Sequence, residues 1–291
     1  MRRENYDIKG GTLSALHFGD ESQPVKLVML HANGLNAQSY RGLLEPLGVH
    51  ALSLDLRGHG MTQLPINPKG LRNFYGFRDD VVEFVQNYIE GPVILSGHSL
   101  GAVVSMLSAP ILKDKMAGYV GFDLPLLSSF LRVVFKMPGG LDFLKSKLPI
   151  AVAAGRRRSE FDSLEQAFGR YKDRGIFKGF PDATLRDYVE GGFIPSQNGY
   201  KLACNPKWEQ SIFPSHDHDL FGAAKQLPLN NTKVVFATSD APSTAFTRAH
   251  MRGVIGKENV ERLADTNHMF PLNQPDIARP FLLDAIKRAK V

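Results

Sequence analysis

The sequence predicts an α/β protein with a mostly parallel sheet, helices on both faces and a mainly helical insertion. In the first half of the chain, short apolar runs alternate with segments that have a helical period. From about Leu124 to Gln226 no buried strand is evident, and the strand pattern returns at Thr232. Strands that alternate with helices at this spacing are typical of a parallel sheet covered by helices.

The individual elements follow from the apolar runs and from the turn residues between them. Two strand-like runs flank Gly10-Gly11 and indicate an antiparallel hairpin at one edge of the sheet. Residues 77–89 carry apolar side chains at helical spacing, and Gly91-Pro92 ends that helix. Buried strands are expected at 25–30, 49–55, 93–95, 119–122, 232–238 and 260–263, and further helices at 102–112, 126–134, 163–170 and 275–290.

The chain length of 291 residues fits one large domain that carries an insertion. We expect residues 1–123 and 227–291 to form the α/β core and residues 124–226 to form a helical cap. The first part of the insertion has an apolar face, which is expected either to line a pocket or to pack on the core. Its residues are Leu124, Leu126, Leu127, Phe130, Leu131, Val134 and Phe135.

The net charge of +6 does not indicate a protein that binds nucleic acid, because the basic residues are scattered along the chain. A nucleic-acid-binding surface would gather them on one element, with aromatic residues nearby. The one basic cluster is Arg156-Arg157-Arg158, which we interpret as a solvated helix end or loop.

The sequence favours a cytoplasmic protein. Its single cysteine, Cys204, excludes an intrachain disulfide and is interpreted as a small buried residue. The amino terminus is basic, but no apolar run follows it, which argues against a secretory signal. No run reaches the roughly 18 apolar residues of a membrane span, so we expect no stable membrane insertion. The oligomeric state stays open.

The strongest sign of chemistry is the run Gly97-His98-Ser99-Leu100-Gly101. A G-x-S-x-G run exposes a nucleophilic serine on a sharp turn when a strand precedes it and a helix follows. Both flanks fit, because the apolar run 93–95 precedes it and the helix expected at 102–112 follows. Glycines beside the serine leave room for the chain at such a turn. Ser99 is therefore the candidate nucleophile.

A serine nucleophile needs a base, and the base needs an acid that orients it. With a serine on this kind of turn, the acid and then the histidine are expected later in the chain. His268, in a loop before the last helix, is the candidate base. Asp240 directly follows a predicted strand and is the candidate acid. Its rival is Asp123, which stands at the end of another predicted strand.

The oxyanion that develops on the substrate needs hydrogen-bond donors. We expect the backbone N–H groups of Leu100, at the start of a helix, and of Asn33, in a loop after the strand at 25–30. His216 and His218 lie in a polar loop and have a spacing that could suit a metal. A connecting loop explains them equally well, and the predicted chemistry requires neither metal nor cofactor.

Four blocks of sequence together resemble the cap-bearing α/β-hydrolases, a family that includes many bacterial esterases, lactonases and carbon–carbon bond hydrolases. The first three are similar to its oxyanion loop, its D-x-R-G-H-G turn and its nucleophile turn, and the fourth to its catalytic histidine loop. They are His31-Ala32-Asn33-Gly34, Asp55 to Gly60, Gly97 to Gly101, and Asn267 to Pro271 with Gln274-Pro275.

This resemblance implies an α/β-hydrolase fold in which residues 124–226 form the variable cap. It also implies that Asp55, Arg57 and His59 shape a loop and take no part in catalysis. Two departures stand out: Ala32 replaces the usual glycine, and no glycine precedes Asp240. Members that open epoxides or remove halogen use an aspartate where this chain has a serine, which argues against those reactions.

The residues and the resemblance together predict hydrolysis through an acyl-enzyme on Ser99. The expected substrate is a small apolar ester, lactone or thioester. The same three residue types would also serve the hydrolysis of a carbon–carbon bond in a diketone. A third hypothesis is a ligand-binding member of the fold with negligible turnover.

Overall fold

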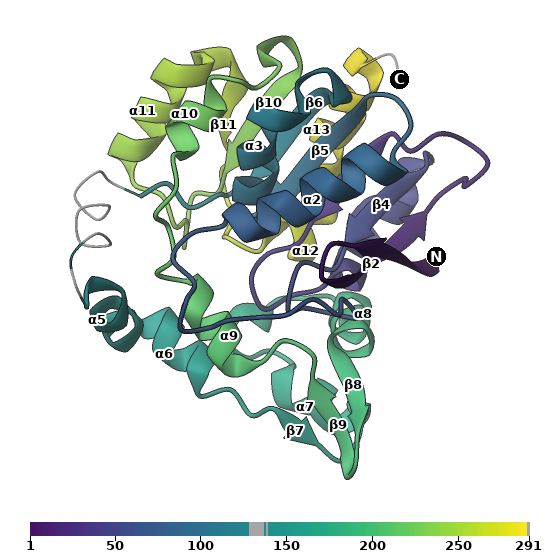
Figure 1. The fold of residues 1–291 in the computed structure, drawn as a ribbon, viewed down its shortest axis with the longest axis vertical. Coiled ribbons are helices and arrows are strands. Elements are labelled where there is room, and N and C mark those ends of the chain that lie inside the picture. The colour runs from purple at the N-terminus through teal and green to yellow at the C-terminus, as the bar shows by residue number, and fades with distance from the viewer. Residues whose placement is uncertain (128–136, 138, 290–291) are drawn as a thin grey trace.

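The computed structural model describes residues 1–127, 137 and 139–289. An eight-stranded sheet runs through the main body, and a smaller unit lies below it in Figure 1. The strands of the large sheet are β1 (Arg2–Ile8), β2 (Gly11–Phe18), β3 (Leu27–Leu30), β4 (Ala51–Leu54), β5 (Val93–His98), β6 (Met116–Phe122), β10 (Thr232–Phe236) and β11 (Val260–Arg262). Their order across the sheet is β1-β2-β4-β3-β5-β6-β10-β11.

The pairing of these strands confirms the predicted fold class. From β4 to β11, every neighbouring pair in the sheet is parallel. The hairpin β1–β2 is antiparallel and joins the edge of the sheet through β2 and β4. Because the strands from β4 onward are parallel, their carboxyl ends meet at one edge of the sheet, where loops can gather functional groups.

Helices cover both faces of the sheet, so its strands carry apolar side chains on both sides. All four side chains of β3 and all four of β4 are buried. The main-body helices are α1 (Arg41–Leu44), α2 (Tyr75–Tyr88), α3 (Leu100–Leu112), α10 (Leu220–Ala224), α11 (Ala245–Ile255), α12 (Phe270–Asn273) and α13 (Pro275–Ala289). No helix in the described ranges is long and apolar enough to cross a membrane.

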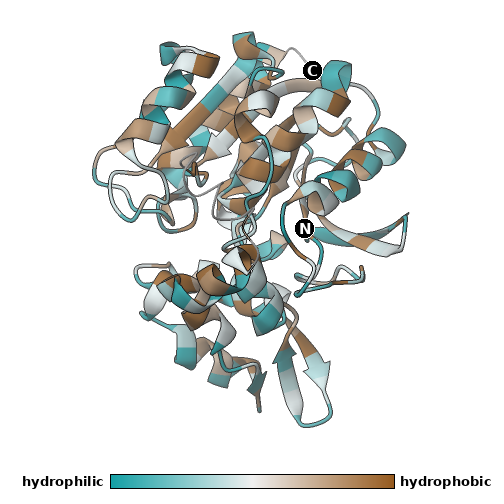
Figure 2. Ribbon diagram, turned by 60° about the vertical axis from the view of Figure 1, so that its left-hand side comes forward, coloured by the Kyte–Doolittle hydropathy of each residue, from teal (hydrophilic) through white to brown (hydrophobic). Residues whose placement is uncertain are grey.

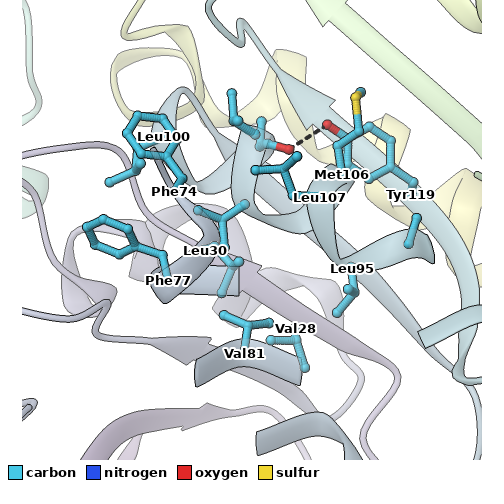
Figure 3. Close-up of a cluster of buried hydrophobic side chains, with 14 of the residues drawn as sticks. Val28, Leu30, Phe74, Phe77, Val81, Leu95, Leu100, Met106, Leu107 and Tyr119 are labelled. Carbon is cyan, nitrogen blue, oxygen red and sulfur yellow. Dashed lines mark hydrogen bonds between the residues drawn. The ribbon is translucent and has the colours of Figure 1, made fainter. Parts of the chain in front are cut away.

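One face of the sheet packs against α2 and α3. Val28, Leu30 and Leu95 of the strands meet Phe77 and Val81 of α2 in a single buried cluster. Figure 3 shows these side chains together, with the Tyr119 hydroxyl donating to the Ala102 carbonyl over 2.8 Å. The same pattern is visible in Figure 2, where hydrophobic residues line the strands of the large sheet.

The smaller unit lies within the predicted cap. Its elements are α5 (Gly140–Lys147), α6 (Pro149–Gly155), β7 (Glu160–Phe161), α7 (Leu164–Tyr171), the 3-10 helix η4 (Gly175–Phe177), α8 (Asp182–Gly192), β8 (Phe193–Ser196), β9 (Gly199–Leu202) and α9 (Pro206–Ile212). The sequence did not predict its antiparallel sheet, of order β7-β9-β8. Strands of two to four residues are too short to show a period in sequence.

The limits of the cap stay a prediction. Helix α10 falls inside 124–226, yet its Leu220, Ala223 and Ala224 join the core cluster beside α3. The helix expected at 126–134 lies mostly outside the described residues.

The turn from β5 into α3 is packed against β3 so closely that only glycine fits. A Cβ on Gly101 would lie 2.1 Å from the carbonyl oxygen of Leu30, and a Cβ on Gly97 would lie 2.2 Å from the carbonyl carbon of Gly101. Both positions meet backbone, which cannot rotate away. The two glycines therefore set the position of the residue between them.

We expect the substitution Gly101→Ala to lower the free energy of unfolding by about 1–3 kcal/mol, because the new methyl group overpacks the β3–α3 contact. The matched control is Gly253→Ala, on exposed α11, where a Cβ would meet nothing within 4 Å. This control should raise stability by about 0.5–1 kcal/mol. Urea denaturation measures both, and equal effects of the two substitutions would contradict the close packing.

Candidate active site

Ser99 lies at the turn between β5 and α3. Its backbone angles, φ 52° and ψ −112°, fall where non-glycine residues are rarely found. Its N–H donates to the carbonyl of Phe122 over 2.9 Å, which ties the turn to β6. Strain of this kind is found at functional sites, where the surrounding structure enforces it. The neighbouring backbone N–H of Leu100 opens helix α3, so it has no partner one turn earlier in the helix.

His268 and Asp123 form a short hydrogen-bonded pair. The histidine lies in the loop between β11 and α12, and its Nδ1–H donates to Oδ2 of Asp123 over 2.6 Å. Oδ1 of the same carboxylate accepts the N–H of Ala237 at 3.0 Å, and the Asp123 side chain is fully buried. With the proton on Nδ1, the Nε2 atom of neutral His268 is left to accept another.

The carboxylate bonded to His268 is thus that of Asp123, the rival, and not that of Asp240, the predicted acid. Asp240 is exposed and follows β10, whereas Asp123 follows β6. In the sheet, β6 lies next to β5, the strand that leads to Ser99, and β10 is one strand further away. Both aspartates follow strands, so their local sequence could not separate them. The missing glycine before Asp240 was the one sign against it.

Two N–H groups with partners flank Asn33, the predicted oxyanion donor, in the loop after β3. The N–H of Ala32 donates to the Tyr40 hydroxyl over 3.1 Å, and that of Gly34 donates to Nε2 of His59 over 3.1 Å. The Asn33 N–H lies between these two, and Asn33 lines the same cavity as Ser99. The Asn33 side chain donates to the backbone carbonyl of Glu209 over 3.0 Å, which fixes the residue against α9.

A buried chain of hydrogen bonds joins this loop to the histidine loop. The Tyr40 hydroxyl accepts from Ala32 and donates to Nδ1 of His98 over 2.7 Å. Nε2–H of His98 then donates to the backbone carbonyl of His268 over 2.8 Å. Burial lowers the pKa of His98 well below its ordinary value. A neutral ring with its proton on Nε2 satisfies both bonds.

Asp55 and His59 hold the backbone of neighbouring loops. The Asp55 carboxylate accepts the N–H of Ala37 at 2.8 Å and that of Met61 at 3.0 Å, and it pairs with Arg3 at 2.5 Å. Nδ1–H of His59 donates to the Arg57 carbonyl over 3.1 Å, and burial lowers its pKa to about 3. These contacts match the loop-shaping role that the resemblance implies.

Ser99 and His268 line one cavity of about 410 Å³ between the main body and the predicted cap. Arg156, Arg157 and Arg158 line it too, so the run interpreted as a solvated helix end belongs to this cavity. Only 13% of the Arg157 side chain is exposed, and it pairs at 2.6 Å with Glu209, which is 5% exposed. Burial raises the pKa of the Glu209 carboxyl, and Arg157 opposes that shift.

The sequence did not predict that Arg157 pairs with Glu209. A single glutamate in α9 gives no local indication of a partner that is distant in the sequence. The guanidinium of Arg157 also donates to the hydroxyls of Tyr171 and Tyr188, so a buried polar cluster forms inside the cap. No signal in the local sequence identifies such a cluster, since its members come from four separate segments.

Other candidate residues lie away from this cavity. Leu124 and Leu126 pack in the main core, whereas residues 130–135 of the expected apolar face lie outside the described residues. His216 and His218 pack against Phe74. In the described part of the chain, no three histidine, cysteine or acidic side chains are grouped to hold a metal ion. Burial raises the pKa of the Cys204 thiol well above its ordinary value.

Comparison with characterised sequences finds two relatives of modest identity. The (E)-2-((N-methylformamido)methylene)succinate hydrolase of Acinetobacter baylyi is 28% identical over 106 residues, 35% of this chain and 39% of that protein. The 2-(acetamidomethylene)succinate hydrolase of Mesorhizobium japonicum is 26% identical over 183 residues, 60% of this chain and 57% of that protein. The matches therefore span only part of each relative's length.

Solved structures match almost the whole chain. The crystal structure of E-2-(acetamidomethylene)succinate hydrolase has a TM-score of 0.76 at 20% identity, covering 98% of this chain and 99% of that one. A thioesterase domain from the curacin biosynthetic pathway has a TM-score of 0.76 at 16% identity, with 98% and 99% covered. An enol-lactonase from Burkholderia xenovorans has a TM-score of 0.67 at 15% identity, with 98% and 100% covered.

At these identities the likeness to solved structures is one of fold. The family model of the alpha/beta hydrolases matches residues 27–278, which include the turn of Ser99 and the loop of His268. The chain belongs to the alpha/beta hydrolase family.

Proposed function

We propose that this protein is a serine hydrolase that cleaves a carbonyl compound through an acyl-enzyme on Ser99. The observation that carries the proposal is the bond between His268 and Asp123, formed beside the cavity that Ser99 and His268 share. A histidine whose Nδ1 proton is held by a buried carboxylate keeps Nε2 available to a serine hydroxyl. The sharp turn at Ser99 supports the same assignment.

In the proposed mechanism, the Ser99 hydroxyl attacks the substrate carbonyl while His268 Nε2 takes its proton. The oxyanion that forms accepts hydrogen bonds from the N–H groups of Leu100 and Asn33. His268 then gives the proton to the leaving group, and the acyl-enzyme forms. Water, deprotonated by His268, then attacks the acyl-enzyme; its bond to Ser99 breaks, and the proton returns from His268 to the Ser99 oxygen as the acid leaves. Asp123 keeps the imidazole in the required tautomer and stabilises the imidazolium that forms in each half of the reaction.

An ester, a lactone or a thioester is the proposed substrate. Ile150, Ile176 and Phe213 give the cavity an apolar part that suits an acyl chain. Carbon–carbon bond hydrolysis would use the same three side chains, and a panel of esters, thioesters and diketones separates the two reactions. The two characterised relatives are named as hydrolases of methylenesuccinates, so one such compound belongs in the panel.

A fluorophosphonate probe should label the wild-type protein at one site and should not label the Ser99→Ala variant. The reason is that such probes react with a serine that an adjacent base activates. Intact-mass measurement reads the stoichiometry, and circular dichroism checks that the variant is folded. A well-folded wild-type protein that binds ligands of the panel tightly, turns none over and resists the probe would point to a non-catalytic ligand-binding protein instead.

We expect Asp123→Asn to lower kcat by about 10³-fold or more, because an amide in this position holds the wrong tautomer of His268. The matched control is Asp240→Asn, which changes an exposed aspartate at the end of the next strand. It should leave kcat within about twofold, as surface substitutions generally do. Steady-state kinetics on the best substrate of the panel decides between them, and the reverse ranking would return the acid role to Asp240.

A further inference from the structure

We propose that the cavity takes substrates that carry an anionic group and that Arg156, Arg170 and Arg174 bind this group. The inference rests on the proposed function, because it names the class of compound that Ser99 would attack. One carboxylate and five guanidinium groups line the cavity, and they are those of Glu209, Arg156, Arg157, Arg158, Arg170 and Arg174.

Two of the five arginines already have partners in the protein. Arg157 is neutralised by Glu209 at 2.6 Å. Arg158 donates to the carbonyl of Glu160 over 2.7 Å and to the side chain of Gln166 over 2.9 Å. These two side chains therefore shape the wall of the cavity and have little capacity left for a ligand.

Among the residues that the structure describes, the other three arginines have no such partner. Within residues 1–127, 137 and 139–289, none of Arg156, Arg170 and Arg174 takes part in an ion pair. All three are exposed, and they come from the end of α6, the last turn of α7 and the segment before η4. Lys172, between two of them, is by contrast paired with Asp182 at 2.8 Å.

Three uncompensated cations at one concave surface produce a positive potential that concentrates anions there. Guanidinium groups bind carboxylate and phosphate through paired N–H donors, so either group fits this chemistry. The arginines all belong to the predicted cap, whereas Ser99 and His268 belong to the main body. A bound molecule would therefore place its reacting carbonyl at the main body and its charge at the cap.

The anionic group could belong to either of two parts of a substrate, and two pairs of charged and neutral substrates distinguish these cases. A carboxylate could lie at the far end of the acyl chain, or a phosphate could lie on the leaving group of a thioester. The first pair is the para-nitrophenyl monoester of glutaric acid and its methyl-capped neutral analogue. The second pair is butyryl-phosphopantetheine and butyryl-pantetheine. The wild-type protein should prefer the charged member of one pair by about tenfold in kcat/KM, the effect of one charge-assisted contact.

Variants assign the preference to the three arginines. Arg156→Gln, Arg170→Gln and Arg174→Gln should each raise KM for the preferred charged substrate about three- to tenfold and leave the neutral analogue within about twofold. The matched control is Lys172→Gln, which removes the same charge from the same segment without touching the cavity. It should leave the preference intact. Added salt should weaken the preference, since the arginines are exposed.

Failure of this inference differs from failure of the proposed function. Stoichiometric labelling of Ser99 with no preference for either charged substrate overturns the anionic-substrate inference and leaves the hydrolase proposal standing. Equal loss of preference in Lys172→Gln also overturns it. If Ser99 is not labelled, calorimetric binding of glutarate by the wild-type protein, weakened in Arg170→Gln and Arg174→Gln, still supports the anion site, and equal binding by all three proteins overturns it.

Discussion

The adjacency of β5 and β6 is the constraint on which the candidate site depends. One strand leads into the turn of Ser99, the other ends at Asp123, and parallel pairing brings both carboxyl ends to the same edge. The N–H of Ser99 bonds to the last residue of β6, so the turn of Ser99 and the candidate acid Asp123 share one piece of backbone. His268 needs only to reach Asp123 to complete the constellation.

A second set of contacts fixes the positions of the loops at that edge relative to one another. Tyr40 and His98 join the loop of Asn33 to the loop of His268 through buried hydrogen bonds. The Tyr40 hydroxyl and the His98 ring each accept one hydrogen bond and donate another. The series of hydrogen bonds therefore has one consistent assignment of protons. A neutral His98 supports that assignment, because burial disfavours its charged form. The distance between the candidate oxyanion donor and the candidate base is thus fixed by side chains inside the core.

Local patterns in the sequence predicted much of this arrangement and missed what depends on distant contacts. Ser99 and His268 could be found because strand, turn and helix signals surround them. The choice between Asp123 and Asp240 needed the order of strands in the sheet, which no window of sequence contains. Arg157 looked solvated because its partner, Glu209, lies 52 positions away. The small sheet β7-β9-β8 was missed because its strands are too short for periodicity.

Glu209 connects the two parts of the molecule in a way that bears on how such proteins diversify. Its carboxylate neutralises Arg157 inside the cap, while its backbone carbonyl holds the side chain of Asn33 beside Ser99. The predicted cap is therefore joined by a direct contact to the loop that carries Asn33. Exchanging this segment for that of another family member would remove both contacts of Glu209 unless the new segment supplied them. Substitutions elsewhere in the cavity wall leave both contacts in place.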